Sequence, residues 1–322
     1  MDSYDNDGGE IKGYIRAELD GTTLNAGYSP PEGSFPNCLF YGSGDGGTHA
    51  TEFGSIDIVG HEYFHGVTTN IGQLEYELES AALCESFSDI FGYTLKNNQI
   101  GSTNWMIGDD IAEVNLFERS FNNPKLFGQH FEDDEFVVGQ PDAYNGEYFY
   151  TGGNDNYFGH INCSVLNRWF YLLSAGESNV TNDHGLMTVS VYGIGISNAF
   201  RIAFNTATEE LISHSSFYYA RLGSIFATID LFGFFSNEVK QVLNAWDAVG
   251  YYGQATQYCT RLSSLSNPTV YDEMIYSSMS TIHLYYTIES GNEIIYRADD
   301  GIYLQPNFEV ELGAAVEFLP IN

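Results

Sequence analysis

Hydrophobic residues recur at a helical spacing through the middle of the chain. This periodicity predicts two helical segments between Ser55 and about Leu95, joined by a loop, and further helices over residues 160–175, 193–214, 216–231 and 236–249. Gly233 and Gly250 fall where the last two patterns stop, as expected for residues that end helices. The middle of the chain is therefore predicted to be a mainly helical lobe.

The segments around the first two helices follow other patterns. Residues 1–53 are rich in Gly, Asp, Ser and Pro, with short β-like runs over 11–19 and 38–41, and are predicted to form strands and loops. Residues 97–159 are polar and rich in Asn, Asp and Gly, which predicts a region that is mostly loop. Loops of this length are uncommon in compact domains unless they serve a site.

From residue 254 onward apolar and polar residues alternate with a period of two. Alternating runs lie at 281–288 and 293–297, and glycines at 291, 301 and 313 separate the runs. This texture is typical of short strands, and we predict a small antiparallel β module. The whole pattern predicts an α+β protein with a β-rich part at 1–53, a helical lobe at 54–253 and the β module at 254–322.

The composition narrows the possible partners. The 322 residues include 43 Asp and Glu against 11 Lys and Arg, which gives a formal net charge of −32 at pH 7. So acidic a chain disfavours nucleic acid as a partner, because it would repel the phosphate backbone, and its self-repulsion favours solubility.

Neither cysteines nor targeting segments add a strong signal. Four cysteines lie far apart without a CxxC pair, which indicates neither a cysteine zinc site nor a dense disulfide framework: Cys38, Cys84, Cys163 and Cys259. No apolar run reaches the ~18 residues of a membrane-spanning helix. The first residues, MDSYDNDGGE, lack the basic and then apolar pattern of a signal peptide.

One stretch places ionisable side chains in a helix that otherwise looks ready for burial: DIVGHEYFHGVTTN, residues 57–70. On a helix, residues four apart point the same way, so His61 and His65 can hold one metal ion together. Glu62 then projects beside the ion, where it can take a proton from the water that the metal activates. A chain of this length contains HExxH by chance on the order of one time in a hundred, so the motif favours zinc without proving it.

A catalytic zinc needs a third protein ligand, and SAALCESFSDIFGYTL at 80–95 offers one. Most of this segment is apolar or small, yet Glu85 and Asp89 stand four apart on one helix face, where an unpaired buried carboxylate is costly. Both charges are accounted for if Glu85 ligates the metal and Asp89 accepts the free ring N–H of a zinc histidine. The alternative is two solvated carboxylates on an exposed face.

The motif as a whole, HExxH at 61–65 followed after 19 residues by ExxxD at 85–89, resembles the thermolysin-like neutral metallopeptidases. Zinc aminopeptidases with a glutamate ligand use one residue fewer and a GxMEN motif that this chain lacks. Thr68 and Ile71 stand where metzincins have a glycine and a third histidine. The resemblance runs from SYDND near the N-terminus to LNAWDAVGYY, about three quarters of the chain.

The resemblance implies a zincin fold and a role for each matching residue. It implies zinc ligation by His61, His65 and Glu85, with zinc as the one catalytic cofactor. Glu62 is the expected general base and then acid, and Asp89 is expected to support a zinc histidine from behind. The implied activity is hydrolysis of peptide bonds in protein or peptide substrates, without a covalent intermediate.

Further residues match the family's groups around the substrate. Tyr76 in QLEYELES and His160 in NDNYFGHINCS are expected to donate hydrogen bonds to the developing oxyanion. Asp155 matches the acid that orients this histidine. Arg119 in FERSFNNP matches the arginine that grips the substrate carbonyl beside the primed-side pocket.

Two more residues belong to the predicted substrate-binding set, Ile58 and Glu118. Glu118 replaces an aliphatic residue expected beside Arg119. It either pairs with that arginine or shifts the side-chain preference after the cut towards basic or polar residues.

The family's paired calcium site is altered in this chain. Asp57 and Asp109 are retained, whereas Lys96, Asn104 and Met106 stand where acids are expected. A lysine ammonium beside the two aspartates neutralises them as an internal cation, in place of the oxygen shell that calcium requires. We therefore predict little or no calcium there.

The N-terminal part of the chain also differs from the family pattern. Family members carry a further β-rich stretch, a propeptide and a signal peptide before the SYDND segment, so the chain is expected to be either truncated or minimal at this end. PPEGSFPN at 30–37 replaces the strand that aligns the substrate, and proline offers no backbone donor for pairing with a peptide. The resemblance implies a secreted protein.

Two functions stay open on the sequence alone. One is a zinc endopeptidase, and the other is a catalytically silent zinc-binding or adhesion protein derived from such an enzyme. Glu62 favours the first, because a binding-only protein has no use for a base beside the metal. The C-terminal module is equally compatible with a solvent-facing appendage and with an attachment or sorting role.

Overall fold

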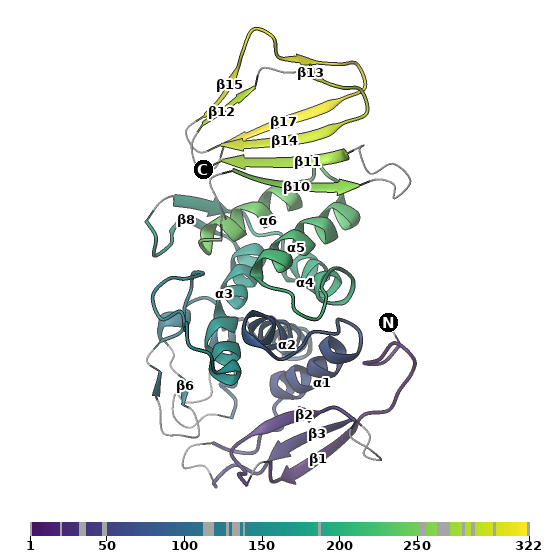
Figure 1. Cartoon of the computed structure of the whole chain (residues 1–322). Helices are drawn as coiled ribbons and strands as arrows, with labels where there is room; N and C mark the ends of the chain where they lie inside the picture. The colour runs from purple at the N-terminus through teal and green to yellow at the C-terminus, as the bar shows by residue number, and fades with distance from the viewer. Residues whose placement is uncertain are drawn as a thin grey trace.

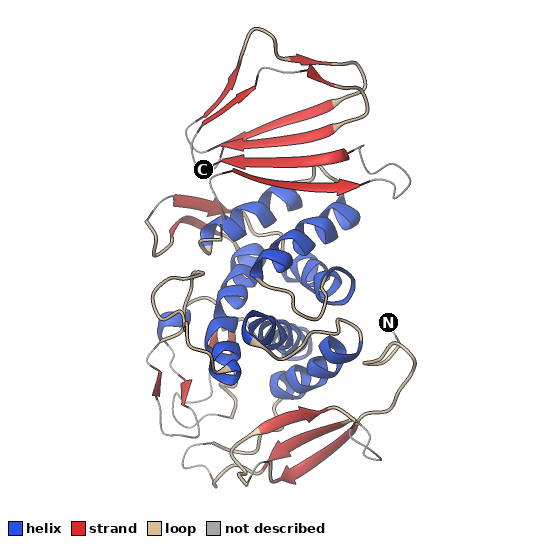
Figure 2. Cartoon of the chain, in the orientation of Figure 1, coloured by secondary structure: helices blue, strands red, loops and turns tan. Residues whose placement is uncertain are grey.

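The computed structural model of the chain describes residues 2–19, 21–31, 37–46, 50–111, 119–126, 129–130, 136–137, 139–185, 188–251, 256–262, 271–278, 281–284, 287–298 and 301–320. Figure 1 shows an N-terminal sheet, a central group of helices and a set of C-terminal strands, arranged in this order along the molecule. Helices and strands are thus segregated along the chain (Figure 2), which confirms the α+β class.

The N-terminal sheet has the strand order β1-β3-β2, formed by β1 (Lys12–Ala17), β2 (Ala26–Ser29) and β3 (Cys38–Gly42). The central strand β3 is parallel to β1 and antiparallel to β2. Its side chains are mostly buried, and Leu39 and Tyr41 pack against Ile58 of the first helix. The two strands predicted in this region are confirmed, and β2 is an additional one.

The described residues of the central lobe form six α-helices: α1 (Ile56–Asn70), α2 (Leu78–Ile100), α3 (Asp155–Ala175), α4 (Ile196–Asn205), α5 (Phe217–Phe232) and α6 (Asn237–Ala248). Every predicted helix is present. The pattern at 193–214 corresponds to α4 and a following π-helical turn, η2 (Thr206–Glu210), rather than to one helix. At the centre of the core, the rings of Trp169 and Trp246 lie 5.4 Å apart.

The two helices that carry the predicted motif meet at a pair of glycines. A Cβ atom at Gly92 would lie 2.2 Å from the carbonyl oxygen of Asp57, and one at Gly60 would lie 3.0 Å from the Cα atom of Gly92. The helices α1 and α2 therefore approach backbone to backbone, which only glycine permits. This close approach brings the side chains of α1 within reach of those of α2.

The described part of the 97–159 region is mostly irregular, as predicted. Its short elements are β4 (Met106–Ile107) paired with β5 (Arg119–Ser120), the 3-10 turn η1 (Pro124–Leu126), and β6 (Gln129–His130) paired with β7 (Phe136–Val137). Helix α2 extends into this region and ends at Gly101, whose φ of 70° is the left-handed conformation that favours glycine. After α3 comes a hairpin that the sequence pattern does not predict, β8 (Glu177–Thr181) and β9 (Thr188–Val191).

The C-terminal module is not the antiparallel unit that we predict from the sequence. A four-stranded sheet has the order β10-β11-β14-β17, formed by β10 (Thr256–Leu262), β11 (Tyr271–Ser278), β14 (Glu293–Ala298) and β17 (Ala315–Pro320). Two pairs of short strands complete it, β12 (Thr281–Leu284) with β15 (Gly301–Leu304) and β13 (Thr287–Ile288) with β16 (Glu309–Val310). Only β10 and β11 are antiparallel, and the other pairs are parallel.

The reason lies in the path of the chain. Glu273 pairs with Glu293, and Glu293 pairs with Ala315, so equivalent positions return after 20 and then 22 residues. Each circuit of the chain therefore lies beside the previous one in the same direction. A period of two in hydrophobicity identifies strands and their inward faces but carries no information on strand direction, which is why the prediction was wrong.

The β module is fastened to the last helix of the lobe. Arg297 on β14 is 1% exposed, and its Nη2 atom donates to Asn244 at 2.7 Å and lies 2.9 Å from Asp247 Oδ2. Ile275 and Ile295 of the same sheet belong to the core of the helical lobe. No helix among the described residues has the length and apolar character needed to cross a bilayer.

Candidate active site

Helix α1 presents two imidazoles on one side. His61 and His65 are one turn apart, their Nε2 atoms are 3.0 Å from each other, and the rings meet edge to face. Their side chains are 6% and 15% exposed. The predicted pair of metal-ligand candidates therefore converges on one point in a nearly dry site.

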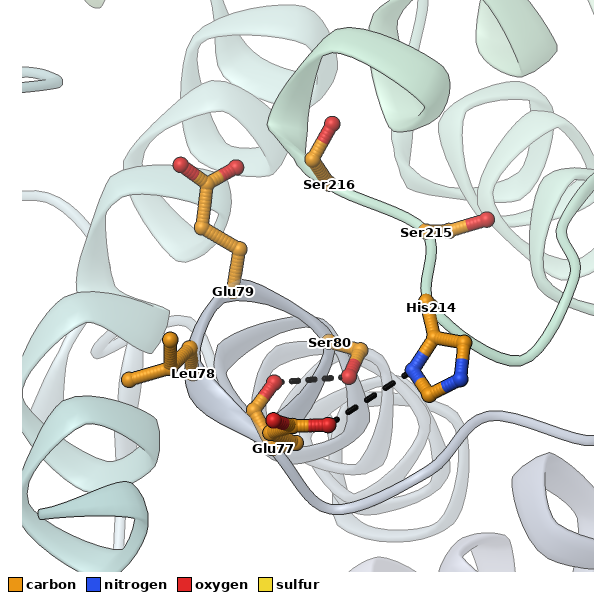
Figure 3. Close-up of a pocket in the computed structure, with 7 residues that line it drawn as sticks. All are labelled: Glu77, Leu78, Glu79, Ser80, His214, Ser215 and Ser216. Atoms are coloured by element: carbon orange, nitrogen blue, oxygen red, sulfur yellow. Dashed lines mark hydrogen bonds and ion pairs between the residues drawn. The ribbon is translucent and has the colours of Figure 1, made fainter. Parts of the chain in front are cut away.

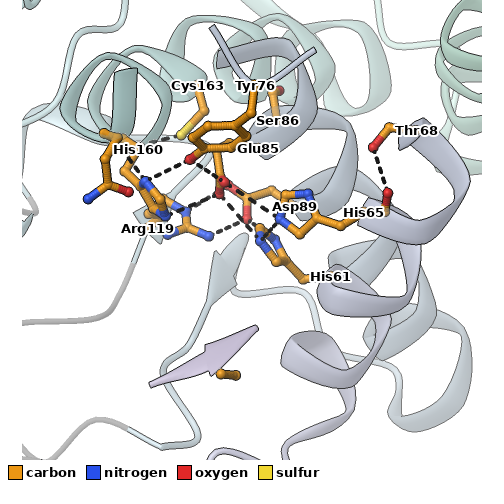
Figure 4. Close-up of polar contacts among 12 residues, drawn as sticks. His61, His65, Thr68, Tyr76, Glu85, Ser86, Asp89, Arg119, His160 and Cys163 are labelled. Atoms are coloured by element: carbon orange, nitrogen blue, oxygen red, sulfur yellow. Dashed lines mark hydrogen bonds and ion pairs between the residues drawn. The ribbon is translucent and has the colours of Figure 1, made fainter. Parts of the chain in front are cut away.

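Glu85 reaches this point from α2. Its Oε2 atom lies 3.4 Å from His61 Nε2 and its Oε1 atom lies 3.5 Å from His65 Nε2. The three side chains each offer one ligand atom, and these atoms all lie within 4.8 Å of one another. Figure 4 shows the three residues turned towards a common centre.

The three donors fit zinc. Two imidazoles and one carboxylate are the ligand types that catalytic zinc uses, and at bond lengths of roughly 2.0–2.2 Å a tetrahedral ion separates its donor atoms by roughly 3.3–3.6 Å. The observed separations of 3.0, 3.4 and 3.5 Å are close to this range. Glu85 Oε2 is also buried without a hydrogen bond from the described residues, which is costly unless a cation completes its environment.

The two imidazoles differ in their electrostatic environment. Burial alone would lower the pKa of His61, but the carboxylates of Asp89 and Glu85 raise it to about 10. Burial lowers the pKa of His65 to about 4, since Glu85 only partly offsets it. The neighbouring histidines hold the pKa of Glu85 well below its usual value despite its burial. In the metal-free site these opposite shifts favour a proton on His61 over one on His65.

Glu62 follows His61 on the same helix and is 7% exposed. Burial raises the pKa of this carboxyl group to about 7, an effect that Glu85 increases and His61 opposes. A group with a pKa near the working pH both accepts and donates a proton readily.

Asp89 lies behind His61, as the sequence predicts. Its Oδ1 atom is 2.8 Å from His61 Nδ1, the ring nitrogen that faces away from the cluster. Arg119 donates to the same carboxylate from β5 through Nε at 2.7 Å and Nη2 at 2.5 Å. The guanidinium, acting against burial, lowers the pKa of Asp89 to about 2, so this carboxylate stays ionised.

The sequence analysis does not identify two residues that touch this group. Asn167 on α3 donates to Asp89 Oδ2 at 2.7 Å, and Ser86 on α2 donates to the amide oxygen of Asn167 at 2.8 Å. All three side chains are 0% exposed. Asn167 lies 78 residues from Asp89 in a helix that is buried along most of its length and holds other buried polar residues, among them Asn162 and Ser164, so its polarity alone did not distinguish it.

Tyr76 and His160 lie on the other side of Glu85. The hydroxyl of Tyr76 donates to Glu85 Oε1 at 2.8 Å and is 3.1 Å from His160 Nδ1. The Nε2 atom of His160 is 3.5 Å from Glu85 Oε2. The two predicted oxyanion donors are therefore beside the metal-ligand cluster, as Figure 4 shows.

Asp155 is engaged elsewhere. Its Oδ1 atom accepts a hydrogen bond of 2.9 Å from the backbone N–H of Leu78, the first residue of α2. The Nδ1 atom of His160 instead lies 2.9 Å from the carbonyl oxygen of Asn156. Orientation of His160 by Asp155 stays a prediction.

Of the predicted substrate-binding residues, the structure describes Ile58 and Arg119. Ile58 is 9% exposed and packs with Leu39 and Tyr41 of β3, and Arg119 is 8% exposed. Glu118 lies outside the described residues. Its predicted effect on the primed-side pocket stays a prediction.

A second charge cluster joins α1, α2 and the loop after β4, and it contains the lysine that the sequence analysis singled out. The Nζ atom of Lys96 is 3.1 Å from Asp57, 2.6 Å from Asp109 and 2.8 Å from Asp110. These carboxylates raise the pKa of Lys96 against the effect of burial. Asn104 Nδ2 also donates to Asp109, at 2.5 Å, and Met106 forms strand β4. We call Lys96 and its three carboxylate partners, Asp57, Asp109 and Asp110, the lysine cage.

A pocket of about 400 Å³ lies at the start of α2, lined by Glu77–Ser80 and His214–Ser216. As Figure 3 shows, His214 faces Glu77, with Nδ1 3.6 Å from the carboxylate. His214 is also 3.7 Å from Glu75, and all three side chains are more than half exposed. His61, His65 and Glu85 are not among the described residues that line this pocket.

Helices α1 and α2 thus carry a set of ligand candidates of the kind that defines zinc metallopeptidases of the zincin class. Comparison with known proteins then gives the family. The chain belongs to the thermolysin metallopeptidase family: the family's catalytic domain matches residues 1–69, and its alpha-helical domain matches residues 72–251. The resemblance inferred from the motif is confirmed.

Comparison with individual proteins supports the same family assignment. Bacillolysin of Bacillus cereus is 35% identical over 215 residues, which cover 66% of this chain and 34% of that protein. Thermolysin of Alicyclobacillus acidocaldarius subsp. acidocaldarius is 36% identical over 217 residues, covering 66% and 36%. The chain therefore spans about a third of the length of these relatives. The solved precursor of protealysin, a metalloproteinase from Serratia proteamaculans, has a similar fold, with a TM-score of 0.57, 25% identity, and coverage of 78% of this chain and 71% of that one.

Proposed function

We propose that this protein is a zinc-dependent endopeptidase that hydrolyses peptide bonds in protein or peptide substrates. The observation that carries the proposal is the buried convergence of His61, His65 and Glu85, with Glu62 next to it in a setting that raises its pKa to about 7. Family membership supports the same reaction.

In this proposal His61, His65 and Glu85 hold one zinc ion. When bound, zinc supplies a Lewis acid that polarises the scissile carbonyl and makes water more acidic. Glu62 takes a proton from the attacking water and delivers it to the leaving amine as the C–N bond breaks. Asp89 keeps His61 in the tautomer whose Nε2 atom faces the metal, because it accepts the proton on Nδ1.

Tyr76 and His160 are proposed to stabilise the oxygen of the scissile carbonyl as negative charge develops on it. Both already direct polar atoms at Glu85, at 2.8 and 3.5 Å, so small rotations suffice to reach an oxygen in front of this ligand. Asp155 would then act on His160 only after releasing Leu78. Arg119 uses two N–H groups on Asp89, and its remaining donors are proposed to bind a substrate carbonyl beside Glu118 and Ile58.

The domain organisation belongs to the same proposal. We propose a β-rich N-terminal part over 1–53, a catalytic helical lobe over 54–253 and a β module over 254–322. A secreted location is proposed from the family resemblance, and the internal ammonium of Lys96 supports the proposal that the lysine cage holds no calcium.

The test combines metal content with cleavage. The zinc-loaded chain is expected to contain one zinc ion and to cleave casein, while Glu62→Gln is expected to keep the zinc and lose activity by about 10³-fold. Activity that survives in Glu62→Gln would contradict the assigned base. A zinc-loaded chain without any cleavage would favour the rival function, a silent zinc-binding or adhesion protein.

A further inference from the structure

We propose that Asn167, with Ser86 behind it, is a positioning residue of the metal centre: its amide fixes the carboxylate of Asp89 and, through it, the ring of His61. The inference rests on the proposed zinc site and deepens it. It concerns side chains from α2 and α3 that touch neither the metal-ligand atoms nor the substrate side of the site.

The orientation of the amide follows from its two neighbours. Ionised Asp89 only accepts hydrogen bonds, so the amide nitrogen of Asn167 must face it, at 2.7 Å. The amide oxygen then points the other way and receives the hydroxyl of Ser86 at 2.8 Å. Ser86 and Asp89 are three residues apart on α2, so side chains on one face of this helix hydrogen-bond both ends of the Asn167 amide.

The bond from Asn167 completes the environment of Asp89. Its Oδ1 atom faces His61 Nδ1 and Arg119 Nη2, and its Oδ2 atom accepts from Arg119 Nε and Asn167 Nδ2. A carboxylate has about four acceptor positions: three receive hydrogen bonds from Arg119 and Asn167, and the fourth faces His61 Nδ1 at 2.8 Å. Since Asp89 is 0% exposed, no bulk water can replace a donor that is removed.

The three hydrogen bonds to Asp89 come from different sides. Arg119 draws the carboxylate towards β5 with two charge-assisted bonds, whereas Asn167 holds Oδ2 from α3. The balance leaves Oδ1 at 2.8 Å from His61. Without the amide, the carboxylate is free to rotate towards the guanidinium, and the support of the histidine ring weakens. Asn167 contributes this restraint as a neutral group and so leaves the charge of Asp89 unchanged.

The test measures zinc affinity rather than turnover, by competition with a chromophoric chelator. Asn167→Leu is expected to weaken zinc binding by about tenfold, in the range found for residues that support metal ligands, and Ser86→Ala by about threefold. The matched control is Asn162→Leu. Asn162 is on the same helix, is also 0% exposed and makes two hydrogen bonds of 2.9 Å, but to the backbone of Tyr150.

A merely structural role predicts a different outcome. In that case Asn167→Leu and Asn162→Leu would lower the melting temperature of the zinc-free protein and leave the zinc dissociation constant within twofold of the wild type, which would overturn the inference. Should Asn167→Leu fail to fold, Ser86→Ala decides, and an unchanged zinc constant in that variant also overturns it. If the wild type binds zinc but cleaves no protein, the proposed function fails while this inference stands.

Discussion

The helices α1 and α2 each contribute to two charge clusters, which differ in where the cation comes from. The metal-ligand cluster gathers His61, His65 and Glu85, whose ligand atoms lie within 4.8 Å of one another, and in our proposal an exchangeable zinc ion supplies its cation. The lysine cage gathers three aspartates around the ammonium of Lys96. Both arrangements solve the same problem, since buried carboxylates are costly unless a positive charge compensates them.

The difference between the two clusters separates chemistry from stability. A metal ion can leave a coordination position open for water and substrate, whereas a tethered ammonium offers only hydrogen bonds to the groups around it. The lysine cage therefore has no means of binding a substrate carbonyl as a Lewis acid. It resembles a cation site in its ligands and a salt bridge in its function.

The comparison predicts the largest effect for removal of the exchangeable cation. Dialysis against a chelator is expected to reduce casein cleavage to background, because no side chain replaces the Lewis acid. Unfolding should also become easier, since zinc at 100 times its dissociation constant adds about 2.7 kcal/mol to the stability of the folded state. Zinc should restore both properties and calcium neither. Cleavage that persists without metal would break the comparison.

Removal of the tethered cation should affect stability alone. Lys96→Met leaves Asp57, which is fully buried, without its ammonium, and is expected to lower the free energy of unfolding by about 3 kcal/mol. Chemical denaturation measures this change, and the zinc dissociation constant should stay at the wild-type value.

Lys125→Met is the matched control for this variant. Lys125 also lies among three carboxylates, those of Asp142, Glu147 and Asp183, but its side chain is 24% exposed. Because solvent screens these pairs, we expect a loss of less than about 1 kcal/mol. Equal losses in the two variants would show that burial does not set the strength of the lysine cage.

The third prediction concerns pH. Because the pKa of metal-free His61 is raised to about 10, this ring holds a proton at pH 6–8 that zinc must displace. His65, with a pKa lowered to about 4, holds none in this range. Zinc affinity should therefore rise about tenfold per pH unit from pH 6 to 8. Chelator competition in Glu62→Gln, which removes the carboxyl group that titrates near 7, isolates this slope, and a flat profile would refute the assignment.

The smallest effect is expected from calcium. In the wild type the ammonium of Lys96 occupies the lysine cage, so 5 mM calcium should leave the melting temperature unchanged. In Lys96→Met the three aspartates are free to bind the ion. With a dissociation constant of about 1 mM, 5 mM calcium adds about 1 kcal/mol to the stability of this variant. A stabilisation of the wild type instead would show that the cage still accepts calcium.

The sequence predicts the part of the site that depends on spacing within single helices. The motif residues from His61 to Asp89 lie on two adjacent helices, so the spacing of four places them on common faces. The replacement of an acid by Lys96 was equally visible in the sequence, and the internal ammonium it predicts is present.

The parts that escaped prediction depend on contacts between distant segments. Asn167 meets Asp89 only because α3 packs on α2, and Asp110 joins the lysine cage only because the chain turns back after β4. The direction of the strands in the C-terminal module likewise follows from the circuit of the whole chain rather than from any local pattern. Periodicity predicted which residues are strands and failed for how they pair.

The glycine contact between α1 and α2 has a consequence for both clusters at once. The carbonyl oxygen of Asp57 faces Gly92, its side chain enters the lysine cage, and His61 follows one turn later. A single methyl group at position 92 would act as a wedge under this turn. The same displacement would move Asp57 away from Lys96 and tilt the ring of His61 away from Glu85. The geometry of both clusters therefore depends on the absence of a side chain at position 92.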